Sequence, residues 1–286
     1  MIAIFVIARL SIAEVIRRRI VWVLLGLTVL SVGLTTWGVD RLVSLSRANG
    51  TSELVIFVGV AGVLVLVAFM FSFVLAMTAA FLAAPAIATD LETGVAHAML
   101  ARPIRRGELV VGRWLGLSLV VLAYSLVSGL LEIYAFHLVS GYLPPKPLEA
   151  ALYLGAQAIV LLTVALLLST RLPAIASGAI CVVLFGLGWM AGVFANVGQF
   201  LNAGPLVTVA DASRWLLPSD GLWRGTIHAL QPPIDFLTGA GAVGNAANAN
   251  PFFAPDPPPA GFLVWVVIWT VLVLGLASIS LDRRDL

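Results

Sequence analysis

Long stretches without a charged residue divide this chain into six segments, each at least about as long as a membrane-spanning helix. They are Ile20 to Val39, Leu54 to Thr89, Trp114 to Leu131, Ala150 to Thr170, Leu172 to Ala210 and Pro257 to Leu281. About 20 apolar residues in a helix cross the hydrocarbon core of a bilayer. With 61% hydrophobic and 10% charged residues, the composition is that of a membrane protein rather than a soluble one. We therefore predict an all-α integral membrane protein with six transmembrane helices in one domain over residues 1–286.

Two of these stretches are longer than one span requires. As a single helix, Leu54 to Thr89 would measure about 54 Å against a hydrocarbon core of about 30 Å. We expect this helix to project beyond the membrane and to bend or stop at Pro85, which has no backbone N–H. Several polar residues, glycines and a proline interrupt the stretch from Leu172 to Ala210, so we expect its span to end near Val197.

The basic residues follow a topological pattern that sets the orientation of the chain. Eleven of the sixteen flank alternate ends of the apolar stretches: Arg9, Arg17, Arg18, Arg19, Arg102, Arg105, Arg106, Arg113, Arg171, Arg283 and Arg284. The positive-inside rule therefore places both termini in the cytoplasm. Because topology accounts for the basic pI of about 9.0, we expect no nucleic-acid partner.

The N-terminal segment, residues 1–19, is predicted to form an interfacial elbow helix on the cytoplasmic surface. Its charged residues are Arg9, Glu14, Arg17, Arg18 and Arg19. Arg9 and Arg17 share one helix face, and Glu14 can pair with Arg18 at i, i+4. The alternative is a basic anchor that only flanks the first span. The apolar-then-basic order is the reverse of a secretory signal, so we expect the segment to be retained.

A long extracytoplasmic loop, residues 198–260, is predicted between the fifth and sixth spans. Within it, Ser219 and Asp220 are predicted to cap a short amphipathic helix that stops at Pro232 and Pro233. Two interpretations remain open. The segment is either a poorly ordered loop with one short surface helix or a partial lid over a translocation path.

Motifs for chemistry are weak throughout the chain. A P-loop needs a Gly-Lys-Ser/Thr ending, and the chain's one lysine, Lys146, lies in Y-L-P-P-K-P. The three histidines are isolated from one another and from the cysteine, so no metal site is expected. We predict that the chain is not an enzyme and has no cofactor of its own.

Two features inside the spans allow both a structural and a functional interpretation. Glu132 and His137 are ionisable groups that we expect near the outer headgroups, although such groups also form sites and proton relays. Gly112 and Gly116, and likewise Gly188 and Gly192, form G-x-x-x-G patterns that permit close helix contact. We consider Gly188 and Gly192 a possible dimer interface, with contacts inside one subunit as the alternative.

The segment from Ala88 to Gly116 packs seven charged residues between two long apolar runs, and we predict a cytoplasmic coupling loop over residues 85–112. It resembles the first cytoplasmic loop of ABC-2 type transporter permeases. An acidic residue, Gly, a Leu-rich turn, Pro, a basic residue and a Gly-Arg pair follow in the family's order. Those places are held by Glu92, Gly94, Leu100, Pro103, Arg106, Gly112 and Arg113, while Val95 departs from the usual Thr.

The resemblance implies the permease subunit of an ABC exporter, a multi-pass protein of the plasma (inner) membrane. Its partners would be two copies of a cytoplasmic ATPase that binds ATP and Mg, a second permease copy or homologue, and the lipid bilayer. The first and fifth spans would line the dimer interface. Coupling to the ATPase would involve Asp90, Glu92, Gly94, Leu100, Arg102, Pro103, Arg105 and Arg106. The alternatives are a subunit that transmits force to a periplasmic maturation partner, and a membrane enzyme or scaffold without an ATPase.

Overall fold

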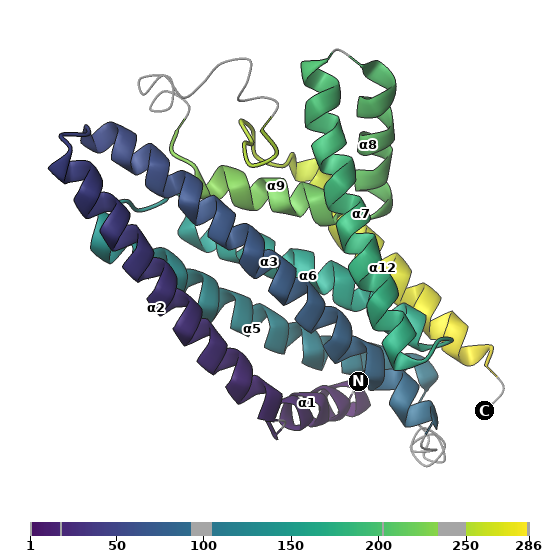
Figure 1. The fold of residues 1–286 in the computed structure, drawn as a ribbon. Coiled ribbons are helices and arrows are strands. Elements are labelled where there is room, and N and C mark those ends of the chain that lie inside the picture. The colour runs from purple at the N-terminus through teal and green to yellow at the C-terminus, as the bar shows by residue number, and fades with distance from the viewer. Residues whose placement is uncertain (1, 18, 93–104, 202, 234–249, 285–286) are drawn as a thin grey trace.

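The computed structural model describes residues 2–17, 19–92, 105–201, 203–233 and 250–284 of the chain. Every regular element in these ranges is a helix (Figure 1). The helices are α1 (Ile2–Arg17), α2 (Arg19–Ala48), α3 (Glu53–Glu92), α5 (Arg106–Ser140), α6 (Pro147–Ser169), α7 (Ala174–Phe200), α8 (Gly204–Leu216), α9 (Ser219–Leu230) and α12 (Ala260–Asp282). The prediction of an all-α protein is therefore confirmed.

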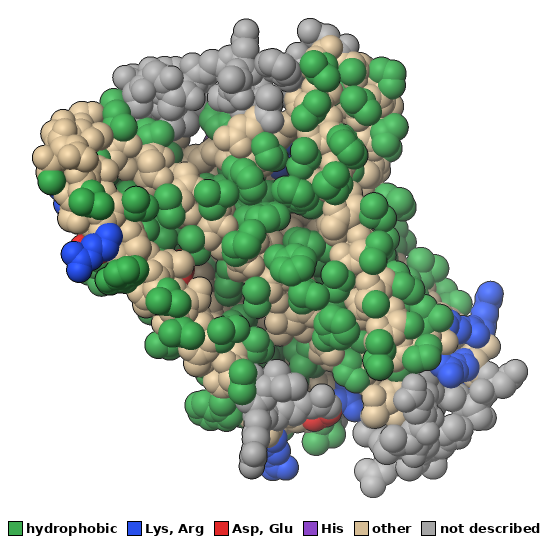
Figure 2. Space-filling view, viewed as in Figure 1, with side chains coloured by type: hydrophobic (Ala, Val, Ile, Leu, Met, Phe, Trp, Pro, Cys, Tyr) green, Lys and Arg blue, Asp and Glu red, His purple; other side chains and the backbone are tan. Residues whose placement is uncertain are grey.

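Six of these helices are long and apolar enough to cross a membrane, namely α2, α3, α5, α6, α7 and α12. Each overlaps one of the six apolar stretches of the sequence, which confirms the number of spans. Hydrophobic side chains cover the middle of the molecule, and Lys and Arg side chains lie toward its ends (Figure 2). This distribution suits helices whose central turns face hydrocarbon.

The boundary between the second and third spans differs from the prediction. Helix α3 does not stop at Pro85 but continues to Glu92, and α5 begins at Arg106. A proline inside a helix removes one backbone hydrogen bond and can be tolerated when neighbouring packing compensates. Both ends of the predicted 85–112 loop are therefore helical, and residues 93–104 lie outside the described residues.

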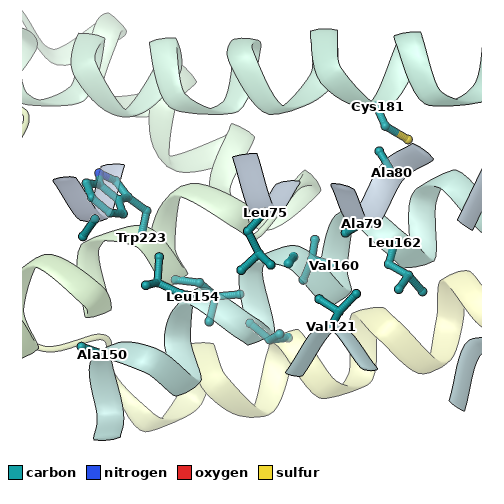
Figure 3. Packing of buried hydrophobic residues seen from close by; sticks show 14 of the residues in the cluster. Leu75, Ala79, Ala80, Val121, Ala150, Leu154, Val160, Leu162, Cys181 and Trp223 are labelled. Atoms are coloured by element: carbon teal, nitrogen blue, oxygen red, sulfur yellow. The ribbon is translucent and has the colours of Figure 1, made fainter. Parts of the chain in front are cut away.

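Helix α6 forms the centre of the bundle. About two thirds of its membrane window (67%) is buried inside the protein, against 11% for α2. Leu154 and Leu162 of α6 pack in one cluster with Leu75 of α3 and Val121 of α5 (Figure 3). Helix α2, in contrast, lies at the edge of the bundle with many large apolar side chains exposed.

The predicted loop 198–260 contains two helices, so the expectation of a poorly ordered loop with one surface helix is wrong for its described part. Helix α8 packs along α7, and α9 lies across the end of the bundle against α6 (Figure 1). Leu222, Ile227 and Leu230 of α9 are almost fully buried. The predicted caps also differ, because Pro218 precedes α9 without a side-chain cap bond. We call α8 and α9 together the α8–α9 cap.

Candidate functional site at the arginine-rich end

One end of the bundle gathers most of the basic residues, and we call it the arginine-rich end. The start of α1, the end of α3, the start of α5 and the end of α12 all lie there (Figure 1). Its described arginines are Arg9, Arg17, Arg105, Arg106, Arg113, Arg171, Arg283 and Arg284. The α8–α9 cap lies at the opposite end.

Arg106 joins the start of α5 to the end of α12. Its Nη1 donates hydrogen bonds to the carbonyl oxygens of Leu281 at 2.9 Å, Asp282 at 3.1 Å and Arg284 at 2.8 Å. Carbonyls in the last turn of a helix have no donor within the helix, and a cation there is also favoured by the helix dipole. Arg106, predicted to act in coupling, is thus engaged within its own chain.

The turn between α6 and α7 is joined to the same end of α12. Arg171 donates from Nε to Ser280 Oγ at 3.1 Å and from Nη2 to Ser280 O at 3.0 Å. In the other direction, Arg284 donates to Thr170 O at 2.6 Å. The end of α12 therefore connects α5 with the α6–α7 turn, and we call this set of bonds the arginine clamp.

The elbow helix α1 docks closely on α5 through the G-R-W-L-G motif. A Cβ added at Gly116 would lie 2.5 Å from Ala8 O, and one at Gly112 would lie 2.7 Å from Ile7 Cβ. Only glycine permits two helix backbones to approach this closely. The structure thus gives the first G-x-x-x-G pattern a role inside the chain.

An ion pair reinforces this docking. Arg113 Nη1 lies 2.7 Å from Glu14 Oε2, and the Arg113 side chain is only 10% exposed. The sequence suggested Arg18 as the partner of Glu14, but Arg18 lies outside the described residues. A pair between residues 99 positions apart follows from tertiary packing and not from helical spacing.

The remaining predicted coupling residues are only partly described. Asp90 and Glu92 belong to the last turn of α3. Arg105 precedes α5 with an exposed side chain, and its backbone N–H donates to Glu108 Oε2 at 3.2 Å. The others, Gly94, Leu100, Arg102 and Pro103, lie outside the described residues, and so does Arg18 of the elbow. Of the elbow arginines, Arg9 and Arg17 are exposed, and the side chain of Arg19 is not described.

The two glycines proposed for a dimer interface instead face the cap of their own chain. A Cβ at Gly188 would lie 3.1 Å from Ser219 Oγ, and one at Gly192 would collide with the Asp220 carboxylate. Both glycines are buried within the chain. The contact inside one subunit, which the sequence left open, therefore occupies this face of α7.

Asp220 belongs to a buried polar cluster that the sequence analysis missed. Its Oδ2 accepts a hydrogen bond from Arg214 Nε at 2.8 Å, and its side chain is 5% exposed. Burial raises the pKa of Asp220, and the neighbouring Arg214 guanidinium opposes that shift. Arg224 lies in the same cluster and donates to Asn196 Oδ1 at 2.7 Å.

Comparison with protein families agrees with this architecture. The family model described as ABC-2 family transporter protein matches residues 5–286, almost the whole chain. The chain belongs to the ABC-2 transporter family. No curated protein matches the chain. As an ABC-2 permease, it is a multi-pass membrane subunit of an ABC transporter. In the part of the chain that the structure describes, no group of three His, Cys, Asp or Glu side chains could hold a metal ion.

Proposed function

We propose that this ABC-2 permease works in an ATP-driven exporter and receives the motion of a separate ATPase at its arginine-rich end. Two ATPase copies, which bind ATP and Mg, would contact the connection between α3 and α5 on two permease subunits. The positive-inside rule supports a cytoplasmic position for this end. Export then follows from rigid-body motion of the spans, driven by closure of the ATPases.

The observation that carries this proposal is that contacts at the arginine-rich end join several helices to the α3–α5 connection. The α3–α5 connection leads directly into Arg106, and the arginine clamp continues from there to α12 and the α6–α7 turn. Through Gly112, Gly116 and Arg113 the same start of α5 holds α1. A displacement of this connection therefore reaches α1, α5, α6, α7 and α12 without passing through the α8–α9 cap.

The experiment compares one charge reversal at each end of the protein. Arg105 at the arginine-rich end and Arg41 on α2 both have exposed side chains, so Arg105→Glu and Arg41→Glu change net charge equally. The tagged full-length chain is purified from its native membrane and the amount of co-purified ATPase is measured. We expect Arg105→Glu to reduce that amount at least tenfold, which corresponds to about 1.4 kcal/mol, and Arg41→Glu to leave it unchanged.

Two results contradict the proposal. Absence of any ATPase from the wild-type preparation favours a scaffold or enzyme. If Arg105→Glu, Arg41→Glu and Glu92→Arg all recover as much ATPase as the wild type, the α3–α5 connection is not part of the ATPase interface. Arg105 is preferred to Arg106 for this test because the Arg106 guanidinium also holds the end of α12.

A further inference from the structure

A cavity of 390 Å³ lies among the spanning helices α2, α3, α5 and α6 and is also lined by Leu230 of α9. Most of its lining is apolar, but hydroxyl groups from α2 and α5 and one carboxyl group also line it. These polar residues are Thr28, Ser31, Thr35, Tyr124, Ser128 and Glu132. Its volume lies in the range of about 300–1,000 Å³ that is typical of small-molecule sites.

A second cavity, of 380 Å³, is lined by α2, α3 and α5 and by Val15 of α1, nearer the arginine-rich end. Its lining is apolar apart from Thr78 and the Tyr124 phenol, and it includes Leu75, Leu82 and Val121. Tyr124 lines both cavities. The two hollows therefore adjoin at Tyr124, whose hydroxyl lies 2.7 Å from Thr28 Oγ1 of α2. We call the polar and the apolar hollow together the α2–α5 cleft.

Glu132 gives the polar half a capacity to bind a cation. One carboxylate oxygen accepts a hydrogen bond from Thr35 Oγ1 at 2.6 Å. Among the described residues, no arginine, lysine or histidine forms an ion pair with Glu132. A carboxylate offers about four acceptor positions, and a single hydroxyl fills one of them. An acidic side chain in a membrane span is costly and by default marks a site.

Ser128 supplies a second and independent sign of a missing ligand. It lines the cavity one helical turn from Glu132 and is 2% exposed. Within the described residues, its Oγ has no hydrogen-bond partner. A buried polar group without a partner costs about 1–3 kcal/mol, and a donor or acceptor bound in the cavity would remove that cost.

The length of the cleft matches one hydrocarbon chain. From Val120 in the apolar half to Glu132 in the polar half, α5 rises by about 18 Å. Half of the hydrocarbon core of a bilayer is about 15 Å thick. We propose that the α2–α5 cleft binds a single-chain amphiphile, with a protonated amine headgroup at Glu132 and Ser128 and its hydrocarbon chain running past Tyr124. This binding requires no ATPase and is independent of the proposed export cycle.

Three probes that share one chain but differ in headgroup test the proposal. Hexadecylamine, hexadecanol and hexadecanoic acid are titrated into the full-length protein in phosphatidylcholine nanodiscs, and binding is followed by native mass spectrometry. We expect the amine to bind at least tenfold more tightly than the alcohol, and the acid to bind least. The Glu132→Gln variant keeps the shape of the side chain and is expected to abolish the preference for the amine.

Glu149→Gln is the control, because Glu149 also lies on a spanning helix but pairs with Lys146 at 3.0 Å outside the cleft. We expect this variant to bind all three probes as the wild type does. Hexadecylamine with a photoreactive diazirine in its chain locates the chain directly. We expect cross-links to α3 residues 75–82 and α5 residues 120–124.

Several results overturn the proposal. These are equal binding of amine and alcohol, an unchanged preference in Glu132→Gln, or cross-links confined to other helices. Displacement of hexadecylamine by a two-chain phosphatidylethanolamine at equal concentration contradicts a single-chain site. Because ATPase recovery is measured separately, failure here leaves the proposed coupling intact, and loss of coupling leaves this site intact.

Discussion

The two ends of the helical bundle are held together by different kinds of polar interaction. At the α8–α9 cap, Asp220 is 5% exposed and pairs with Arg214, while Gly192 leaves room for its carboxylate. At the arginine-rich end, Arg106 and Arg171 donate to partly exposed carbonyl and hydroxyl oxygens at the end of α12. The buried pair at the cap is satisfied in one geometry only. At the arginine-rich end, water can replace the hydrogen-bond partners of Arg106 and Arg171.

This difference has an energetic consequence for how the protein moves. Removing one partner of a buried ion pair leaves an uncompensated charge, whereas exposed polar contacts contribute little because solvent competes for them. The Arg214–Asp220 pair therefore stiffens the cap, whereas the arginine clamp rearranges at low cost. At that same end, the Arg113–Glu14 pair keeps α1 docked on α5. That asymmetry suits a permease whose arginine-rich end receives motion from a partner.

The largest expected effect comes from breaking the buried pair of the cap. Arg214 contacts both Asp220 at 2.8 Å and Asp211 at 2.9 Å, with side chains 5% and 53% exposed. We expect Asp220→Ala to cost about 3–5 kcal/mol of stability and Asp211→Ala less than about 1 kcal/mol. Thermal unfolding of the purified protein in detergent measures both. Equal losses for the two variants would mean that the cap is no stiffer than an exposed contact.

A smaller effect is expected at a tightly packed contact of the arginine-rich end. Gly116→Val places a side chain against the backbone of α1, and such overpacking costs about 1–3 kcal/mol. Gly275→Ala on α12 is the control, because an added Cβ there meets no atom within 4 Å. Unfolding temperatures give the comparison, and limited proteolysis reports whether α1 has detached. A fully stable Gly116→Val protein with α1 in place would contradict the close packing.

The sequence predicted the spans because their length and lack of charge are local properties, and it identified the family from the segment around Glu92 and Arg106. It missed what tertiary contacts create. Asp220 was read as a helix cap because its spacing permits one, but Arg214 engages its side chain. Helix α8 was missed because the glycines and asparagines before it resemble a loop. The α2–α5 cleft is likewise invisible in sequence, since residues of six separate helices line it, α1, α2, α3, α5, α6 and α9.

The smallest global effect is expected from opening the arginine clamp. Arg106→Ala removes three donated hydrogen bonds, but the freed carbonyls near the end of α12 can bind water. We expect less than about 1 kcal/mol of lost stability, together with at least tenfold faster hydrogen exchange at the amides of Arg283 and Arg284. Arg105→Ala, one residue earlier, is the control and is expected to change neither. Hydrogen exchange followed by mass spectrometry measures the local effect. If Arg106→Ala instead lowers stability as much as Asp220→Ala, the clamp is as stiff as the cap and the proposed division between a fixed cap and an adaptable clamp is wrong.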